Sequence, residues 1–248
     1  MNIKTKRGIS NKRGDMTTTQ IVMLIILIVS FAVLLILYFR LGLGELSDKQ
    51  ICYNSVILKS KSPGSIGAGG LDCKTNYICI SGGKDCKDMI PTKTIDVNPK
   101  EKQEIFKPIA EEMADCWWIF GEGKVDYVEY LVNVFPESHC AVCSVVKFDE
   151  TIQGEFLDGF DYEEFYNFLS VEQVKEGQSY LNYLYGGIKD VSLLNYSIER
   201  SSGKFFTDKQ YLIITGMKEE NDYIYPYFIY SEELYSKEIC RNFDITKA

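Results

Sequence analysis

Apolar residues form one uninterrupted run, IVMLIILIVSFAVLLILYF, at positions 21–39. The run has no charged residue, and Ser30 is its one clearly polar member apart from Tyr38 at the boundary. Nineteen helical residues with a rise of about 1.5 Å each span roughly 28 Å, enough to cross a hydrocarbon core. A core helix of a soluble domain would carry a polar face. We therefore predict a transmembrane helix at 19–40.

Helical periodicity resumes at 45–60, where Tyr53, Val56 and Ile57 fall close to one face. The next ten residues, KSPGSIGAGG, are rich in glycine and serine and predict a loop. Residues 41–70 are therefore expected to form a juxtamembrane helix followed by a Gly/Ser-rich loop.

The remainder of the chain mixes alternating and helical patterns. Asn98 and Pro99 have the character of an N-cap and first helical residue, Pro108 is expected to kink or split the helix, and Gly121 ends it. The runs at 209–217 and 223–232 predict a hairpin, and Pro226 favours an edge position for its second strand. Other expected elements are strands at 77–80 and 143–150, short helices at 160–170, 171–186 and 231–240, and an ambiguous stretch at 126–135.

These patterns contain no internal repeat and no second interdomain linker. The expected fold class is α+β, with one N-terminal transmembrane helix followed by a single disulfide-stabilised mixed α+β ectodomain. The domain organisation is then a basic leader at 1–18, the membrane helix at 19–40, the juxtamembrane segment at 41–70 and a cysteine-rich α+β domain at 71–248.

The charges flanking the apolar run predict its orientation. Arg40 is the one basic residue immediately after it, and cytoplasmic flanks carry the excess of Lys and Arg. The N-terminus is therefore expected in the cytoplasm and the chain after about residue 41 outside. A cleaved secretory signal is the alternative, but the run exceeds the usual apolar region of about 7–15 residues and no A-x-A-like site follows. We interpret it as a signal anchor. The basic residues before it are Lys4, Lys6, Arg7, Lys12 and Arg13.

The predicted exterior is acidic. Six of the 27 basic residues and one of the 35 acidic residues precede position 41, which leaves 21 basic and 34 acidic residues and a net charge of −13. A negative surface repels phosphate backbones, so nucleic acid is not an expected partner.

All eight cysteines lie beyond the apolar run, on the predicted oxidising side, which is the arrangement of a disulfide framework. Bridges that close long loops contribute most in the chain-entropy model, so a bond from Cys52 to Cys240 would contribute roughly 5 kcal/mol and one from Cys140 to Cys143 only roughly 2 kcal/mol. Alternatively, Cys140 and Cys143 bond to separate partners, for instance Cys116. The cysteines are Cys52, Cys73, Cys79, Cys86, Cys116, Cys140, Cys143 and Cys240.

The stretch HCAVCS at 139–144 is the main candidate for chemistry. Cys140 and Cys143 form a C-x2-C pair, and the single histidine, His139, precedes it. In a thiol-disulfide oxidoreductase such a pair begins a helix whose N-terminus stabilises the thiolate. Here the β-branched residues that follow favour a strand. A zinc site needs a second C-x2-C or a histidine pair, and the sequence has neither. The favoured interpretation is a structural staple, with no metal or other cofactor expected.

Other motifs carry weaker signals. FGEGK at 120–124 lacks the spacing and the Ser or Thr of a phosphate loop. Trp117 and Trp118 point about 100° apart on a helix, so we expect one in the core and the other packed at its edge. Paired acidic residues show no convergence toward a hydrolytic site. Asn195 begins an N-x-S sequon and is a glycosylation candidate.

The N-terminus, with KRG at 12–14 before DMTTTQ and the apolar helix, is similar to the class III signal peptides of archaeal type IV pilin-like proteins. The resemblance implies cleavage after Gly14 and packing of the helix into a filament. Thr19 stands where such proteins have a glutamate. LDCKT with ICI (71–80), MADCWWIFGEGKVDYV (113–128) and HCAVCS with FD (139–149) resemble a recurring kind of uncharacterised archaeal single-pass surface protein, which implies no activity or ligand.

The sequence thus predicts a membrane-anchored cell-surface protein that acts by binding or assembly rather than by catalysis. Its expected partners are the membrane and a protein or surface glycan. A membrane-tethered oxidoreductase using Cys140 and Cys143, and a pilin-like filament subunit, are the alternatives.

Overall fold

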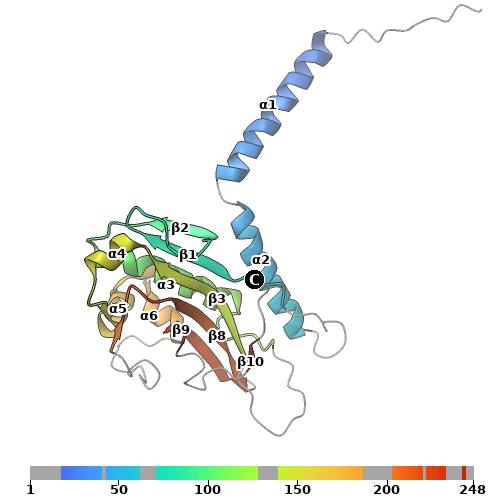
Figure 1. Cartoon of the computed structure of the whole chain (residues 1–248). Helices are drawn as coiled ribbons and strands as arrows, with labels where there is room; N and C mark the ends of the chain where they lie inside the picture. The colour runs from blue at the N-terminus through green and yellow to red at the C-terminus, as the bar shows by residue number, and fades with distance from the viewer. Residues whose placement is uncertain are drawn as a thin grey trace, which may run out of the picture. The chain divides into compact units, whose positions relative to one another are not determined.

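The structure is a computed structural model that describes residues 18–40, 43–61, 71–127, 139–186, 203–219, 222–232 and 242–243 (Figure 1). The glycosylation candidate Asn195, Cys240, and most of the predicted elements at 126–135 and 231–240 lie outside these residues.

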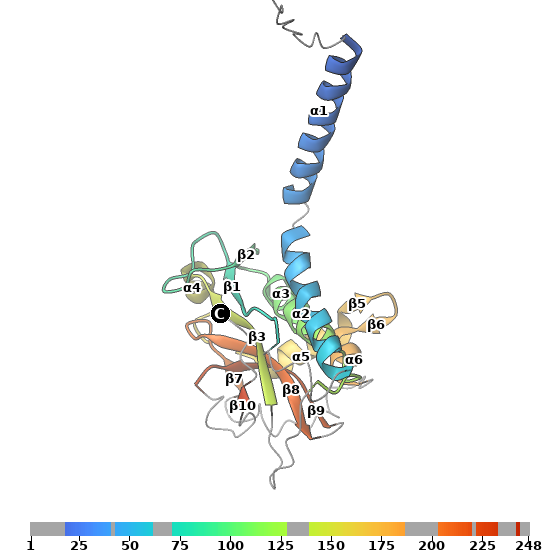
Figure 2. The same ribbon diagram turned by 90° about the vertical axis from the view of Figure 1, so that its right-hand side faces the viewer.

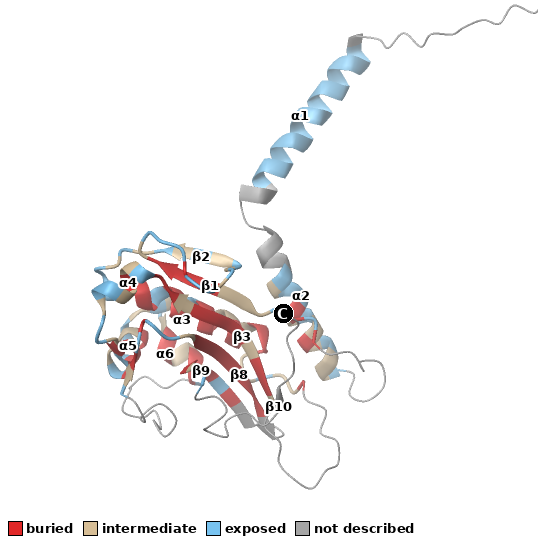
Figure 3. Cartoon of the chain, viewed as in Figure 1, coloured by how far each residue is buried: buried red, intermediate tan, exposed pale blue. Residues whose placement is uncertain are grey.

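The chain divides into two compact units, Met1–Ser47 and Asp48–Ala248. The first contains α1 (Thr18–Arg40), whose described side chains are all exposed (Figure 3). The stretch Thr19–Leu37 has a mean hydropathy of 3.1 and is long and apolar enough to span a membrane. The predicted apolar helix is therefore confirmed.

The second unit, which we call the head, begins within α2 (Leu43–Lys61). Cys52 and Val56 are buried in its core, and the ring of Tyr53 stacks on Trp118 with centroids 4.6 Å apart. α2 lies beside α3 (Lys102–Ile119) (Figure 2). The head thus starts before residue 71, where we expected it, because this helix packs into the core instead of standing free as a stalk.

A single mixed sheet forms the centre of the head. Its strand order is β2-β1-β3-β8-β9. β2, β1 and β3 run parallel to one another, β8 is antiparallel to β3, and β9 is antiparallel to β8. β10 pairs with the start of β3. The predicted hairpin and the edge position of its Pro226 strand are confirmed. The strands are β1 (Asn76–Ser81), β2 (Lys93–Asp96), β3 (His139–Phe148), β8 (Tyr211–Glu219), β9 (Asp222–Tyr230) and β10 (Asn242–Phe243).

The two faces of the sheet bury different clusters. One face packs against α3, α5 (Tyr162–Val171) and α6 (Tyr180–Leu184). Phe106 of α3 contacts the rings of Phe160, Phe165 and Phe205 in an aromatic core. The opposite face carries a smaller buried cluster of Cys140, Val145, Leu212, Ile214, Ile224 and Ile229.

The ends of α3 differ in how well the sequence predicted them. Its N-cap is Glu101, three residues beyond the expected Asn98, which instead begins a turn closed by a hydrogen bond from the Glu101 N–H. α3 runs through Pro108 as one helix. Gly121, with φ +80°, ends it as expected, because the N–H groups of Gly121 and Glu122 bond the carbonyls of Trp118 and Trp117 in a Schellman motif.

Other short elements complete the head. The prediction of a helix over 171–186 is wrong. β5 (Gln173–Lys175) and β6 (Gln178–Ser179) form a small hairpin there, and within this stretch only the residues of α6 continue as a helix after it. Gly177 has φ +77°, a turn conformation that a helix does not use. α4 (Glu150–Glu155) was not predicted, and β4 (Phe160–Asp161) pairs with β7 (Lys204–Phe205).

Candidate functional site

HCAVCS forms the first part of β3, the central strand. Residues three apart in a strand point to opposite faces, so Cys140 joins the small cluster on one side and Cys143 joins the core on the side of α3. Only 1% of Cys140 and 8% of Cys143 is exposed. The two thiol positions therefore cannot face each other, and neither begins a helix.

A bulge lies between Val142 and Ser144 in the pairing of β3 with β8. It leaves Cys143 as the extra residue, so that Cys143 and Ser144 both interact with α3: Cys143 through a disulfide to Cys116, and Ser144 through a hydrogen bond from its hydroxyl to Glu112 at 3.1 Å. Glu112 is 3% exposed and also receives the ammonium of Lys93 at 3.2 Å.

The structure pairs Cys52 with Cys73, Cys79 with Cys86 and Cys116 with Cys143. The pair Cys52–Cys240 considered from loop length is therefore wrong, because α2 packs with Cys52 against the segment before β1. Cys140 is also disulfide-bonded, to a partner outside the described residues. A redox exchange between Cys140 and Cys143 requires a bond that this pairing does not contain.

His139 begins β3, where it lies opposite Met217 of β8 and Asn242 of β10. Across the part of the chain that the structure describes, no group of three His, Cys, Asp or Glu residues is placed to hold a metal ion.

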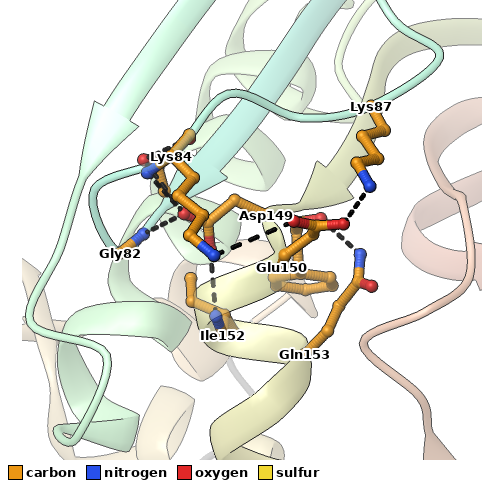
Figure 4. Close-up of polar contacts among 9 residues, drawn as sticks. Gly82, Lys84, Lys87, Asp149, Glu150, Ile152 and Gln153 are labelled. Carbon is orange, nitrogen blue, oxygen red and sulfur yellow. Dashed lines mark hydrogen bonds and ion pairs between the residues drawn. The ribbon is translucent and has the colours of Figure 1, made fainter.

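A second constellation lies at the carboxyl ends of the parallel strands β1 and β3, at the loop SGGKDCK (81–87) (Figure 4). The Asp149 Oδ2 atom accepts the backbone N–H groups of Gly82 at 3.0 Å and Lys84 at 2.8 Å, and its Oδ1 atom accepts the N–H of Ile152 at 2.9 Å. We call Asp149 and the loop residues that it holds the Asp149 clamp.

Asp149 is fully buried, and burial alone would raise the pKa of its carboxyl. The hydrogen bonds from the N–H groups of Ile152, Lys84 and Gly82 outweigh that effect and hold the pKa below its ordinary value. Glycine-rich loops and helix N-termini at the ends of parallel strands commonly bind anions. In this protein the carboxylate of Asp149 takes the place of a bound anion. Its hydrogen bonds to the backbone N–H groups fix the conformation of the loop.

Exposed charged side chains lie beside the clamp (Figure 4). Glu150 forms ion pairs with Lys84, at 3.8 Å, and with Lys87. The hydrogen bond and charge of Lys87 hold the pKa of Glu150 below its ordinary value, and Glu150 in turn raises the pKa of Lys87. The loop is also closed by the Cys79–Cys86 disulfide.

An open groove of about 620 Å³ adjoins Glu150. Leu157, 80% exposed, and Phe206, 40% exposed, are its large apolar side chains. Its size falls within the range of ligand pockets, about 300–1,000 Å³. The remaining lining residues are Gln153, Gly154, Thr207, Asp208 and Lys209.

The FGEGK segment ends α3, and its Glu122 also binds two side chains. Glu122 has φ +56°, which non-glycine residues rarely adopt, and its carboxylate accepts the Tyr183 hydroxyl at 2.8 Å and pairs with Lys124. Burial, and then the bond to Glu122, raise the pKa of Tyr183. Trp117 is buried, whereas Trp118 packs at the core edge on Tyr53, as expected for the two tryptophans.

Sequence reasoning missed the Asp149 clamp. The available signals were the N-cap pattern DETIQ after a strand and the glycine pair after the strand at 77–80. Neither signal shows that the two segments meet.

No protein-family model, no curated protein and no solved structure matches this chain. The site is therefore interpreted from its own geometry.

Proposed function

We propose that this protein is a membrane-anchored cell-surface protein whose disulfide-stabilised head lies outside the cell and acts by binding or assembly. The observation that carries the proposal is α1, in which every described side chain from residue 19 to residue 37 is exposed although most are large and apolar. Such a surface is stable when lipid surrounds it.

The disulfides support an extracytoplasmic head, because disulfides persist in oxidising compartments. The three described pairs hold α2 to the segment before β1, β1 to its own loop, and α3 to β3. They join the elements that surround the sheet, which favours a durable binding scaffold over an exchanging redox pair.

The groove beside Glu150 is the candidate surface for a protein or glycan partner. It combines the apolar side chains of Leu157 and Phe206 with the charged groups of Glu150, Asp208 and Lys209, and the Asp149 clamp holds one of its walls in place. Interfaces commonly combine apolar and polar contacts.

Membrane extraction and protease accessibility test the proposal. We expect the full chain to stay in the membrane fraction after washing at alkaline pH. In intact cells, external protease should remove an epitope tag at the C-terminus and spare one at the N-terminus. Permeabilised cells, in which both tags are cut, provide the control. Release by the alkaline wash, or a protected C-terminal tag, would contradict the proposal.

A pilin-like subunit is the second candidate, and the succession of α1 and α2, separated by two residues, favours it because pilin-like stems continue an apolar helix into the head. The mass of the N-terminal peptide decides it. Cleavage after Gly14 supports this candidate, whereas an intact peptide spanning Gly14 and Asp15 excludes it.

A further inference from the structure

The Cys52–Cys73 disulfide lies where the chain enters the head. The head begins at Asp48, within α2, and β1 begins at Asn76. Cys52 and Cys73 are separated by 21 positions along the chain, yet their Cα atoms lie 4.5 Å apart. The same length of chain, fully extended, would span roughly 70 Å. The bond therefore gives the chain a covalent path into the sheet that bypasses residues 53–72.

The described noncovalent contacts of α2 with the rest of the head are limited. Two of its described residues are buried, and one of these is Cys52 itself. The Lys49 ammonium lies 2.5 Å from the Asp115 carboxylate, but both side chains are partly exposed, and such ion pairs contribute little to stability. Tyr53 stacks on Trp118 at the edge of the core. A helix held in this way can be peeled from its end one contact at a time.

The covalent path and the groove beside Glu150 lie at opposite ends of the strands. Cys73 stands shortly before Asn76, the amino end of β1. Because β1 and β3 run parallel and β8 is antiparallel to β3, β8 begins at the carboxyl end of β1. Lys209, which lines the groove, stands shortly before this start of β8. A pull between the groove and Cys73 therefore runs along the strands and loads the hydrogen bonds of β1 to both of its neighbours together.

We infer that the Cys52–Cys73 disulfide carries tension between the membrane anchor and the central sheet, and that residues 53–72 bear none of it. The inference rests on the proposed function, because tension arises when α1 is held in a membrane and the head holds a partner. With the bond intact, the sheet is the first part of the head to yield. Without the bond, α2 peels from the head and residues 53–72 extend before the sheet is loaded.

Magnetic tweezers applied to the full chain in detergent micelles test this. Azide-bearing amino acids replace Arg40, at the end of α1, and Lys209, beside the groove, and carry the two DNA handles. In Cys52→Ala/Cys73→Ala, a step of about 70 Å in contour length should come at a lower force than the unfolding of the sheet. In the chain that keeps the bond, we expect the sheet to unfold with no such step before it.

Cys79→Ala/Cys86→Ala removes a bridge that begins inside β1, beyond the entry to the sheet, and is the matched control without the early step. Tyr53→Ala, with the Cys52–Cys73 bond intact, should leave the force of the first step unchanged. The early step in a chain with the bond, its absence from the chain without it, or a lower force in Tyr53→Ala would each overturn the inference and leave the proposed function standing. Release of the chain by the alkaline wash would overturn the proposed function and the inference with it.

Discussion

Cys143 in the central strand is bonded to Cys116 in α3, while Cys140, three residues earlier, lies on the other face of the sheet. The two cysteines of the C-x2-C pair therefore form separate bonds on opposite faces of the sheet, and the bond of Cys143 joins the sheet to α3. This separation follows from the two-residue period of a strand.

The first prediction concerns disulfide mapping. Trypsin without reduction should yield an adduct in which the peptide at 125–147 is linked to the peptide at 103–124 through Cys143. A peptide at 125–147 closed by its own internal bridge would contradict the structure.

The second prediction concerns the stability that each bridge provides. The Cys116–Cys143 bond spans 27 residues and the Cys79–Cys86 bond spans 7. In the chain-entropy model, replacing the first pair with alanine lowers the free energy of unfolding by about 3.5 kcal/mol and replacing the second by about 2 kcal/mol. Denaturant unfolding of the two double variants measures the difference. Equal losses would show that loop length does not determine the contribution.

The third prediction concerns Asp149. Asp149→Asn turns an amide N–H₂ toward backbone donors and should lower the free energy of unfolding by about 1–3 kcal/mol. Glu150→Gln, at the adjacent and exposed position, is the matched control and should change it by less than about 0.5 kcal/mol. Thermal or denaturant unfolding measures both. A larger effect at Glu150 would show that the surface ion pairs order the loop.

The fourth prediction follows from the lowered pKa of Asp149. As pH falls, the unfolded chain binds the proton first, near its reference pKa of about 3.9, while the folded carboxylate remains ionised. The stabilisation is therefore fully present above that pH and is lost as pH falls through the lower folded pKa. The difference in stability between the wild type and Asp149→Asn should be constant from about pH 5 to 7 and shrink below about pH 4. A difference that grows on acidification would contradict the assignment.

The fifth prediction concerns the close approach of β8 to the start of HCAVCS. A Cβ atom at Gly216 would lie 2.0 Å from the carbonyl oxygen of His139. Gly216→Ala should therefore lower the free energy of unfolding by at least about 2 kcal/mol. Gly154→Ala, in a helix and with open space around the new methyl group, should be neutral or stabilise by about 0.5–1 kcal/mol. Equal effects in an unfolding titration would contradict the register of β3 and β8.

Local patterns predicted some elements well because their determinants are local. The α1 helix follows from an unbroken apolar run, and the Schellman stop at Gly121 follows from the backbone freedom of one glycine. The prediction of a helix over 171–186 was wrong because the turn at Gly177 outweighed the helical pattern of apolar residues. The prediction of Asn98 as the N-cap was wrong because its side-chain oxygen accepts a hydrogen bond from the N–H of Lys100 in a turn before the helix.

The sequence by itself determined the apolar helix, the α+β class and a strand from Cys143 onward, and each depends on neighbours within a few residues. The structure begins that strand at His139, which points Cys140 and Cys143 to opposite faces. Only the tertiary structure decided that Cys52 bonds to Cys73, that Cys116 reaches Cys143, and that Asp149 meets the loop after β1. These contacts join segments far apart in the chain, and they depend on which helix covers which face of the sheet and on which strands run side by side.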